Sequence, residues 1–150
     1  MADDAEHAAL APSAPAPPTA PRTAPSAGPG ATMHIGAVAD RTGLSLRTLR
    51  HYDEVGVLRP SGRTDGGFRL YTQHDVERLL LIRRMKPLGF TLEEMREVLD
   101  LVESLADPAV DPQGPREHLA AFVVRAEQRR AELARTLEMA DEFIDLLRRR

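Results

Sequence analysis

Residues 35–52 read IGAVADRTGLSLRTLRHY and contain two short helical patterns separated by a turn. From Ile35 to Ala39, apolar side chains follow the i, i+3, i+4 spacing of a helix. Gly43 then interrupts the pattern, and Ser45 is a residue type that caps helix N-termini. The stretch therefore predicts a helix, a tight turn and a second helix.

The second of these helices has one apolar face and several sides that bear polar groups. Leu49 and Tyr52 share the apolar face, which leaves Arg47, Thr48 and Arg50 able to meet solvent or a ligand. Core packing is the alternative to ligand contact for the two apolar-face residues. An ion pair with Asp53 or Glu54 of the same helix is the alternative for Arg50.

A glycine-rich segment, RPSGRTDGGFRLY at residues 59–71, follows the second helix. Asp65-Gly66 is a favoured pair for a two-residue hairpin turn, in which both residues take positive φ. We therefore expect a small β-wing whose arms carry Arg63 and Arg69.

Two further helices are predicted by their start and stop signals. Thr72 caps the third helix, which ends at Pro87-Leu88-Gly89 because proline and glycine interrupt helices. Thr91 and Glu94 form a capping box that begins the fourth helix. A linker rich in proline over residues 106–114 follows it.

The segment 115–150 has the clearest periodicity in the chain. Leu119, Ala126, Leu133, Ala140 and Leu147 repeat every seven residues. A helix of about 35 residues is about 50 Å long, more than a core of this size can cover, so it needs a partner helix. The predicted dimerisation seam consists of Leu119, Val123, Leu133, Leu137, Ile144 and Leu147.

Charge and composition divide the 150 residues into three parts. Residues 1–32 are rich in proline and alanine, lack a hydrophobic period, and predict a disordered tail. The net charge is −2 for that tail, +4 for residues 33–90 and −5 for residues 91–150. The basic middle part suggests a polyanionic partner.

Several classes of function are disfavoured by what the sequence lacks. It has no cysteine, and its five histidines lack the spacing of metal ligands, so no metal and no cofactor are predicted. No set of catalytic residues is recognisable, and we expect no enzyme. No apolar run is long enough for a membrane span, and we expect a cytoplasmic protein.

The order of these elements is that of a winged helix-turn-helix, a DNA-binding architecture. A helix fits the major groove of DNA, guanidinium groups bind guanine or phosphate, and a glycine-rich wing can lie close to the sugar-phosphate backbone. On the periodicity alone, an ordinary helical hairpin with solvated arginines is the alternative.

Residues 33–105 resemble the DNA-binding domain of MerR-family transcription regulators through the linked motifs MHIGAVA, RTLRHY, GVLRP, GFRLY and LGFTLEE. The resemblance implies a mainly α fold: a winged helix-turn-helix domain over 33–105, followed by a long C-terminal dimerisation helix over 115–150 that forms an antiparallel coiled coil. It also implies a DNA-binding set made of Arg47, Thr48, Arg50, Tyr52, Arg63, Gly67 and Arg69.

The function implied by the resemblance is that of a sequence-specific DNA-binding transcription regulator. It would act as a homodimer on a palindromic promoter operator and distort the promoter spacer. Its partners would be double-stranded DNA and a second copy of the chain, with RNA polymerase as a candidate partner and no membrane. Two alternatives stay open: an architectural protein that bends DNA without an effector, and a coiled-coil interaction module.

Overall fold

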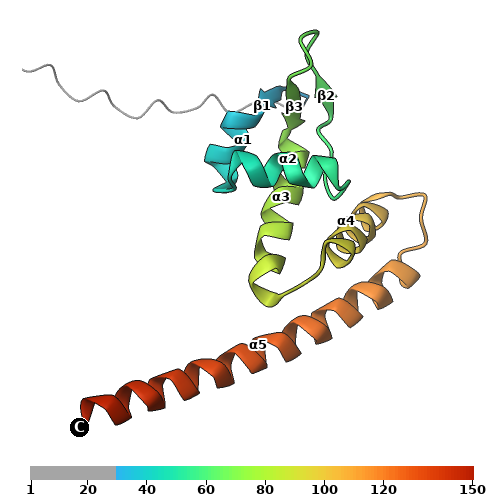
Figure 1. The fold of residues 1–150 in the computed structure, drawn as a ribbon. Helices are drawn as coiled ribbons and strands as arrows, with labels where there is room; N and C mark the ends of the chain where they lie inside the picture. Colours follow the sequence, from blue (N-terminus) through green and yellow to red (C-terminus); the bar gives the residue numbers. More distant parts are fainter. Residues whose placement is uncertain (1–29) are drawn as a thin grey trace, which may run out of the picture.

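The computed structural model describes residues 30–150, and Figure 1 shows the arrangement of their helices and strands. The small sheet and the first two helices lie at one end of the molecule, and the last helix runs past the other end (Figure 1). In chain order the elements are β1 (Thr32–His34), α1 (Ile35–Thr42), α2 (Leu46–Glu54), β2 (Gly62–Arg63), β3 (Arg69–Thr72), α3 (Gln73–Met85), the 3-10 helix η1 (Lys86–Leu88), α4 (Leu92–Ala106) and α5 (Gln113–Arg148).

The predicted helix starts are confirmed by their capping hydrogen bonds. The Thr48 N–H donates to the Ser45 hydroxyl at 3.0 Å and begins α2. At the start of α4, the Thr91 N–H donates to the Glu94 carboxylate at 2.8 Å and the Glu94 N–H donates to the Thr91 hydroxyl at 3.2 Å. Thr72 forms the equivalent capping box at the start of α3. These local pairs satisfy backbone donors that a helix leaves free.

The turn between α1 and α2 is fixed by a glycine and a buried threonine. Gly43 has φ +69°, a conformation that glycine adopts without steric cost, and its N–H donates to the Ala39 carbonyl at 2.8 Å. The Thr42 hydroxyl donates to the Val38 carbonyl at 2.8 Å, inside the core. The chain therefore leaves α1 in one defined direction, and α2 crosses it.

The sheet has three antiparallel strands in the order β1-β3-β2. Arg63 of β2 is opposite Arg69 of β3, as the wing prediction requires. The strand β1 was not predicted, because three residues carry no visible alternation; Thr32, which the sequence assigned to the tail, pairs with Thr72. Residues 1–29 of the predicted tail lie outside the described part of the chain.

The turn at the tip of the wing differs from the predicted two-residue hairpin. The loop spans residues 64–68, and the Thr64 N–H donates to the Phe68 carbonyl at 2.9 Å across its base. Among the wing glycines only Gly67 has positive φ, at +82°. The Gly67 N–H donates to the Thr64 carbonyl at 2.8 Å, so the tight turn closes on Gly67 itself. A longer loop with one left-handed residue, Gly67, therefore replaces the predicted two-residue turn, in which Asp65 and Gly66 would both have positive φ.

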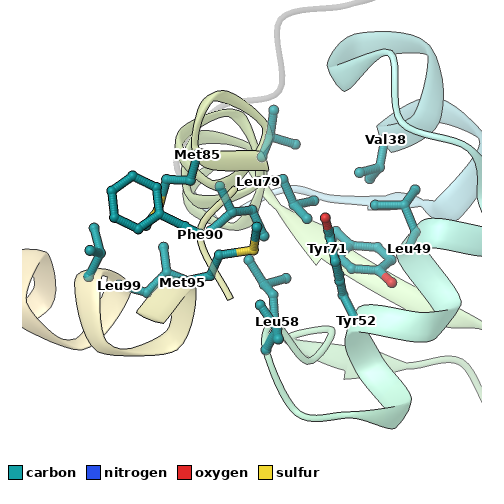
Figure 2. Packing of buried hydrophobic residues seen from close by; sticks show 14 of the residues in the cluster. Val38, Leu49, Tyr52, Leu58, Tyr71, Leu79, Met85, Phe90, Met95 and Leu99 are labelled. Carbon is teal, nitrogen blue, oxygen red and sulfur yellow. The ribbon is translucent and has the colours of Figure 1, made fainter. Parts of the chain in front are cut away.

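One hydrophobic core joins the helix-turn-helix to the later helices (Figure 2). Val38 of α1, Leu49 of α2 and Leu79 of α3 are almost completely buried. Leu99 extends the same cluster from α4, and Phe122 adds the N-terminal half of α5. This core orients α2 with its polar sides outward.

The helix α5 contains 36 residues, which corresponds to a length of about 54 Å. It begins two residues before the predicted start, so that Pro115 stands in the first turn, where proline is tolerated. Its N-terminal half packs on α4 and η1, and its C-terminal half runs beyond the rest of the described chain (Figure 1). No helix in residues 30–150 is long and apolar enough to cross a membrane.

Candidate nucleic-acid interface

The outward side of α2 carries two arginines with free guanidinium groups. Arg47 and Arg50 are exposed, whereas Leu49 and Tyr52 point into the core from the same helix. Within residues 30–150 neither arginine forms an ion pair. The ion pair considered as an alternative for Arg50 is therefore absent from this part of the chain. Both side chains are available for phosphate or for guanine in a major groove.

Thr48 lies at the N-terminal turn of α2, partly buried. Its hydroxyl shares a 2.9 Å hydrogen bond with the Ser45 hydroxyl. A hydroxyl has both donor and acceptor capacity, so this pair still offers hydrogen bonds to a ligand at the start of the helix. The first turn of α2 thus places hydroxyl groups beside the Arg47 guanidinium.

The wing is attached to α2 through one carboxylate that accepts from two arginines. Arg69 donates to the Asp53 carboxylate at 2.7 Å, and Arg63 donates to the same oxygen at 3.0 Å. The hydrogen bond to Asp53 raises the pKa of the Arg69 guanidinium. One carboxylate neutralises only one of the two cations, so the three residues keep a net charge of +1 beside α2. Arg63 and Arg69 are therefore structural residues as well as candidate phosphate contacts.

Gly67 lies at the exposed tip of the wing and binds one of these arginines. Its carbonyl accepts a hydrogen bond from the Arg63 guanidinium at 3.1 Å. Arg63 thus spans from the wing tip to Asp53 on α2. Gly67 has positive φ, and no atom beyond its chain neighbours lies within 4 Å of the place a Cβ would take, so the wing backbone is open to close approach.

Tyr52, predicted as a DNA-contact residue, is buried through its ring but also lines a cleft beside Arg47 and Arg50, so its contact with DNA stays a prediction. Only 3% of Tyr52 is exposed, and its ring lies in the core beside Leu49 and Leu58 (Figure 2). Burial raises the pKa of its phenol. Core packing, the alternative that the pattern left open, is the role that the structure supports for this side chain.

A cleft of about 940 Å³ separates α2 from the start of α4 and brings together residues that are distant in sequence. Arg47 and Arg50 line one side of it, and Lys86 of η1 and Thr91 lie across from them. Lys86 was not among the predicted site residues, because it lies 36 positions after Arg50 in the sequence and nothing local links the two. One signal in the sequence could have identified Lys86: it is the only lysine of the chain. The basic surface is wider than α2 and the wing.

A cluster that we call the joint connects this domain to α5. Glu94 accepts hydrogen bonds from Arg125 at 3.1 Å and from Arg129 at 3.3 Å. The two guanidinium groups also lie over aromatic rings, Arg125 at 4.0 Å from the Phe122 centroid and Arg129 at 4.1 Å from the Phe90 centroid. Ion pairs and cation–π contacts in the same cluster restrict how the domain can tilt on the helix.

The predicted seam residues lie along α5 without a partner in the single chain. Leu119 is partly buried and lines a pocket between the domain and α5. The remaining seam residues, Val123, Leu133, Leu137, Ile144 and Leu147, are between 41% and 63% exposed. In the part of the chain that the structure describes, no three His, Asp or Glu side chains gather as metal ligands.

Comparison with known proteins agrees with this geometry. Residues 33–101 match the family model described as MerR HTH family regulatory protein, and residues 76–142 match the model described as MerR, DNA binding. The HTH-type transcriptional regulator HmrR of Rhizobium leguminosarum bv. viciae is 35% identical over 106 residues, which are 71% of this chain and 81% of that protein.

Two further relatives extend the comparison. The HTH-type transcriptional activator mta of Bacillus subtilis is 38% identical over 101 residues, 67% of this chain, although the match spans only 37% of the activator. The solved structure of HiNmlR, described as a MerR family regulator lacking the sensor domain and bound to promoter DNA, shares the fold with a TM-score of 0.61 at 23% identity. That match covers 79% of this chain and 92% of the other. The relatives are transcription regulators rather than enzymes, and this chain belongs to the MerR family of DNA-binding transcription regulators.

Proposed function

We propose that this protein acts as a homodimer that binds a two-fold promoter operator in a sequence-specific way and distorts the DNA between the half-sites. The observation that carries the proposal is the unpartnered apolar stripe of α5, about 54 Å of helix attached rigidly to a basic domain. A stripe of this length exposes large apolar side chains to water unless a second helix covers it.

The two parts of the basic surface have different roles in this proposal. Arg47, Thr48 and Arg50 read base edges from α2, the helix that fits a major groove: within residues 30–150 the two guanidinium groups form no ion pair, and the Thr48 hydroxyl keeps hydrogen-bonding capacity beside Ser45. The trio of Asp53, Arg63 and Arg69 holds the wing against the sugar-phosphate backbone, where its net charge of +1 attracts phosphate.

Distortion of the operator follows from the rigidity of the joint. If α5 pairs with a second copy and Glu94 fixes the domain on α5, the separation and tilt of the two recognition helices are set by the protein. An operator whose half-site spacing differs from the separation of the two recognition helices must bend to contact both helices. Bending a site of 20–30 base pairs costs about 1–6 kcal/mol, which phosphate contacts from two basic domains can offset.

The consequence for transcription depends on the spacer between the promoter elements. A bound dimer that shortens an over-long spacer brings both elements into line for RNA polymerase and activates transcription. On a spacer of ordinary length, the same dimer blocks polymerase.

Mapping of bound sites across the genome, followed by footprinting on the strongest site, tests the proposal. We expect two symmetric protected half-sites and a dimer by light scattering. A monomer that protects one half-site contradicts the dimer, and uniform coating of DNA supports the architectural alternative instead.

A further inference from the structure

The imidazole of His51 lies on the outward face of α2, away from the hydrophobic core. His51 follows Arg47 by four positions, just over one helical turn, so the two side chains share one face of the helix. Leu49 and Tyr52 occupy the opposite face and are buried. His51 is exposed, and within residues 30–150 its ring makes no hydrogen bond and no ion pair. Both ring nitrogens are therefore available to a ligand.

The charged groups around His51 are mostly cationic. Arg47 and Arg50 of α2 and Lys86 of η1 line the cleft of about 940 Å³ that His51 also lines. Glu54 of α2 is the one carboxylate among the lining residues. Three cations and one carboxylate give the cleft a net charge of +2 when the imidazole is neutral and +3 when it is protonated. A surface of this charge attracts phosphate.

The other residues of the cleft wall keep their charge near neutral pH. Tyr52 is titratable, but burial raises the pKa of its phenol, which therefore stays neutral. The residues at the start of α4 have no ionisable side chain; they are Phe90, Thr91, Leu92 and Met95. His51 is thus the one lining residue of a type that changes its charge between pH 5 and 8.

The position of His51 along α2 places it nearer to the DNA backbone than to the bases. In a helix-turn-helix, the N-terminal residues of the recognition helix contact base edges. Arg47 is the second residue of α2, and His51 lies about 6 Å further along the helix axis. Lys86 lines the same cleft from η1, so a DNA strand that lies in the cleft runs between α2 and a second cationic group.

We propose that His51 binds a DNA phosphate in its protonated form, so that each bound domain takes up a proton and DNA affinity rises as the pH falls from about 8 to about 6. The proposal rests on the DNA-binding surface of the proposed function but does not require the dimer. The DNA phosphates stay anionic over this range, and they attract the imidazolium more strongly than the neutral ring. Because linked equilibria are reciprocal, the factor by which phosphate favours the proton is also the factor by which the proton strengthens DNA binding.

The expected effect is large enough to measure in a binding titration. For an imidazole that ordinarily titrates near pH 6.5, a preference of about tenfold for the charged form raises DNA affinity about fivefold per half-site between pH 8 and pH 6. The salt slope of binding should also be about one unit steeper per half-site at the lower pH, because one more cation contacts phosphate.

Fluorescence anisotropy of the full chain with a duplex that carries the strongest footprinted site tests the proposal, at about pH 6, 7 and 8 and at constant ionic strength. His51→Gln keeps a hydrogen-bonding group but cannot take up the proton; it should bind like the parent at the highest pH and lose the increase at the lowest. His51→Arg carries a permanent charge and should bind tightly, with no increase in affinity as the pH falls. Both substitutions are at an exposed position, where the fold tolerates them.

His74→Gln is the matched control. His74 is exposed at the start of α3, its ring lies 3.5 Å from the Glu103 carboxylate, and it does not line the cleft. This variant should keep the pH profile and the salt slope of the parent.

Equal affinity of the parent at the lowest and highest pH overturns the proposal. A pH profile that His51→Gln retains also overturns it and assigns the proton to another group. A parent chain that binds the duplex at none of these pH values refutes the proposed function itself.

Discussion

The carboxylate of Glu94 is the group whose removal tests the joint most specifically. Its side chain is 18% exposed and accepts from Arg125 and Arg129 while it caps α4 through Thr91. Glu94→Gln keeps an oxygen for the Thr91 N–H but removes the charge. A partly exposed ion pair contributes about 0.5–1 kcal/mol, so two pairs predict a loss of about 1–2 kcal/mol in the free energy of unfolding at neutral pH. Glu94→Ala removes the cap too and should cost about 1 kcal/mol more.

The effect should depend on pH in a defined direction. The hydrogen bond from the Thr91 N–H lowers the pKa of Glu94; burial opposes this, and Arg129 and Arg125 lower the pKa further. A carboxylate with a lowered pKa in the folded state stabilises the fold above its unfolded pKa, and this stability is lost as pH falls through the folded pKa. The difference between the parent and Glu94→Gln should therefore be constant near neutral pH and shrink below about pH 4.3.

Urea denaturation followed by circular dichroism at one fixed protein concentration measures both effects, because dimer stability depends on concentration. Glu93→Gln is the matched control: Glu93 is exposed in the same first turn and has no ion-pair partner within residues 30–150. It should change the free energy of unfolding by only a few tenths of a kcal/mol. Equal losses for the two glutamine variants, or a Glu94 effect that persists unchanged into acid, would refute the joint.

Other predictions concern the dimer and the DNA surface. Leu133→Asp should give monomers by light scattering, because it buries a charge at the centre of the seam; a dimer of unchanged stability would place the seam elsewhere. Arg47→Ala should relax base preference at one operator position and cost about 1–3 kcal/mol per half-site in a binding titration against operator variants. Arg69→Ala should reduce the net charge of the Asp53, Arg63 and Arg69 trio from +1 to zero. It should weaken binding to all DNA sequences alike and lower the salt slope of binding by about one unit. The roles of helix and wing would be reversed if the Arg69 variant lost base preference and the Arg47 variant lost affinity equally for all DNA sequences.

Elements that depend on neighbouring residues could be predicted from the sequence. The caps at Ser45, Thr72 and Thr91 each join groups three residues apart, so the pattern that encodes them is visible in a short window. The repeat from Leu119 to Leu147 is equally local, and α5 extends over it.

Features that depend on distant pairing were missed. The strand β1 exists because β3, almost 40 residues later, supplies its hydrogen-bond partners. Asp53 holds Arg63 and Arg69 only after the wing folds back on α2, and the sequence suggested Asp53 or Glu54 as a partner for Arg50 instead. Lys86 reaches the cleft through the packing of η1 against the core. In each case the sequence shows the residue type but not the long-range contact that gives it a role.

Circular-permutation gel mobility of the operator complex is the measurement that tests the central claim most directly. A rigid dimer with fixed domain spacing predicts that mobility changes with the position of the operator in the fragment and is lowest when the operator is central. Leu133→Asp, as a monomer, should abolish that dependence. Complexes of the parent protein that migrate alike at every operator position would contradict promoter distortion and leave steric blocking of polymerase as the mode of action.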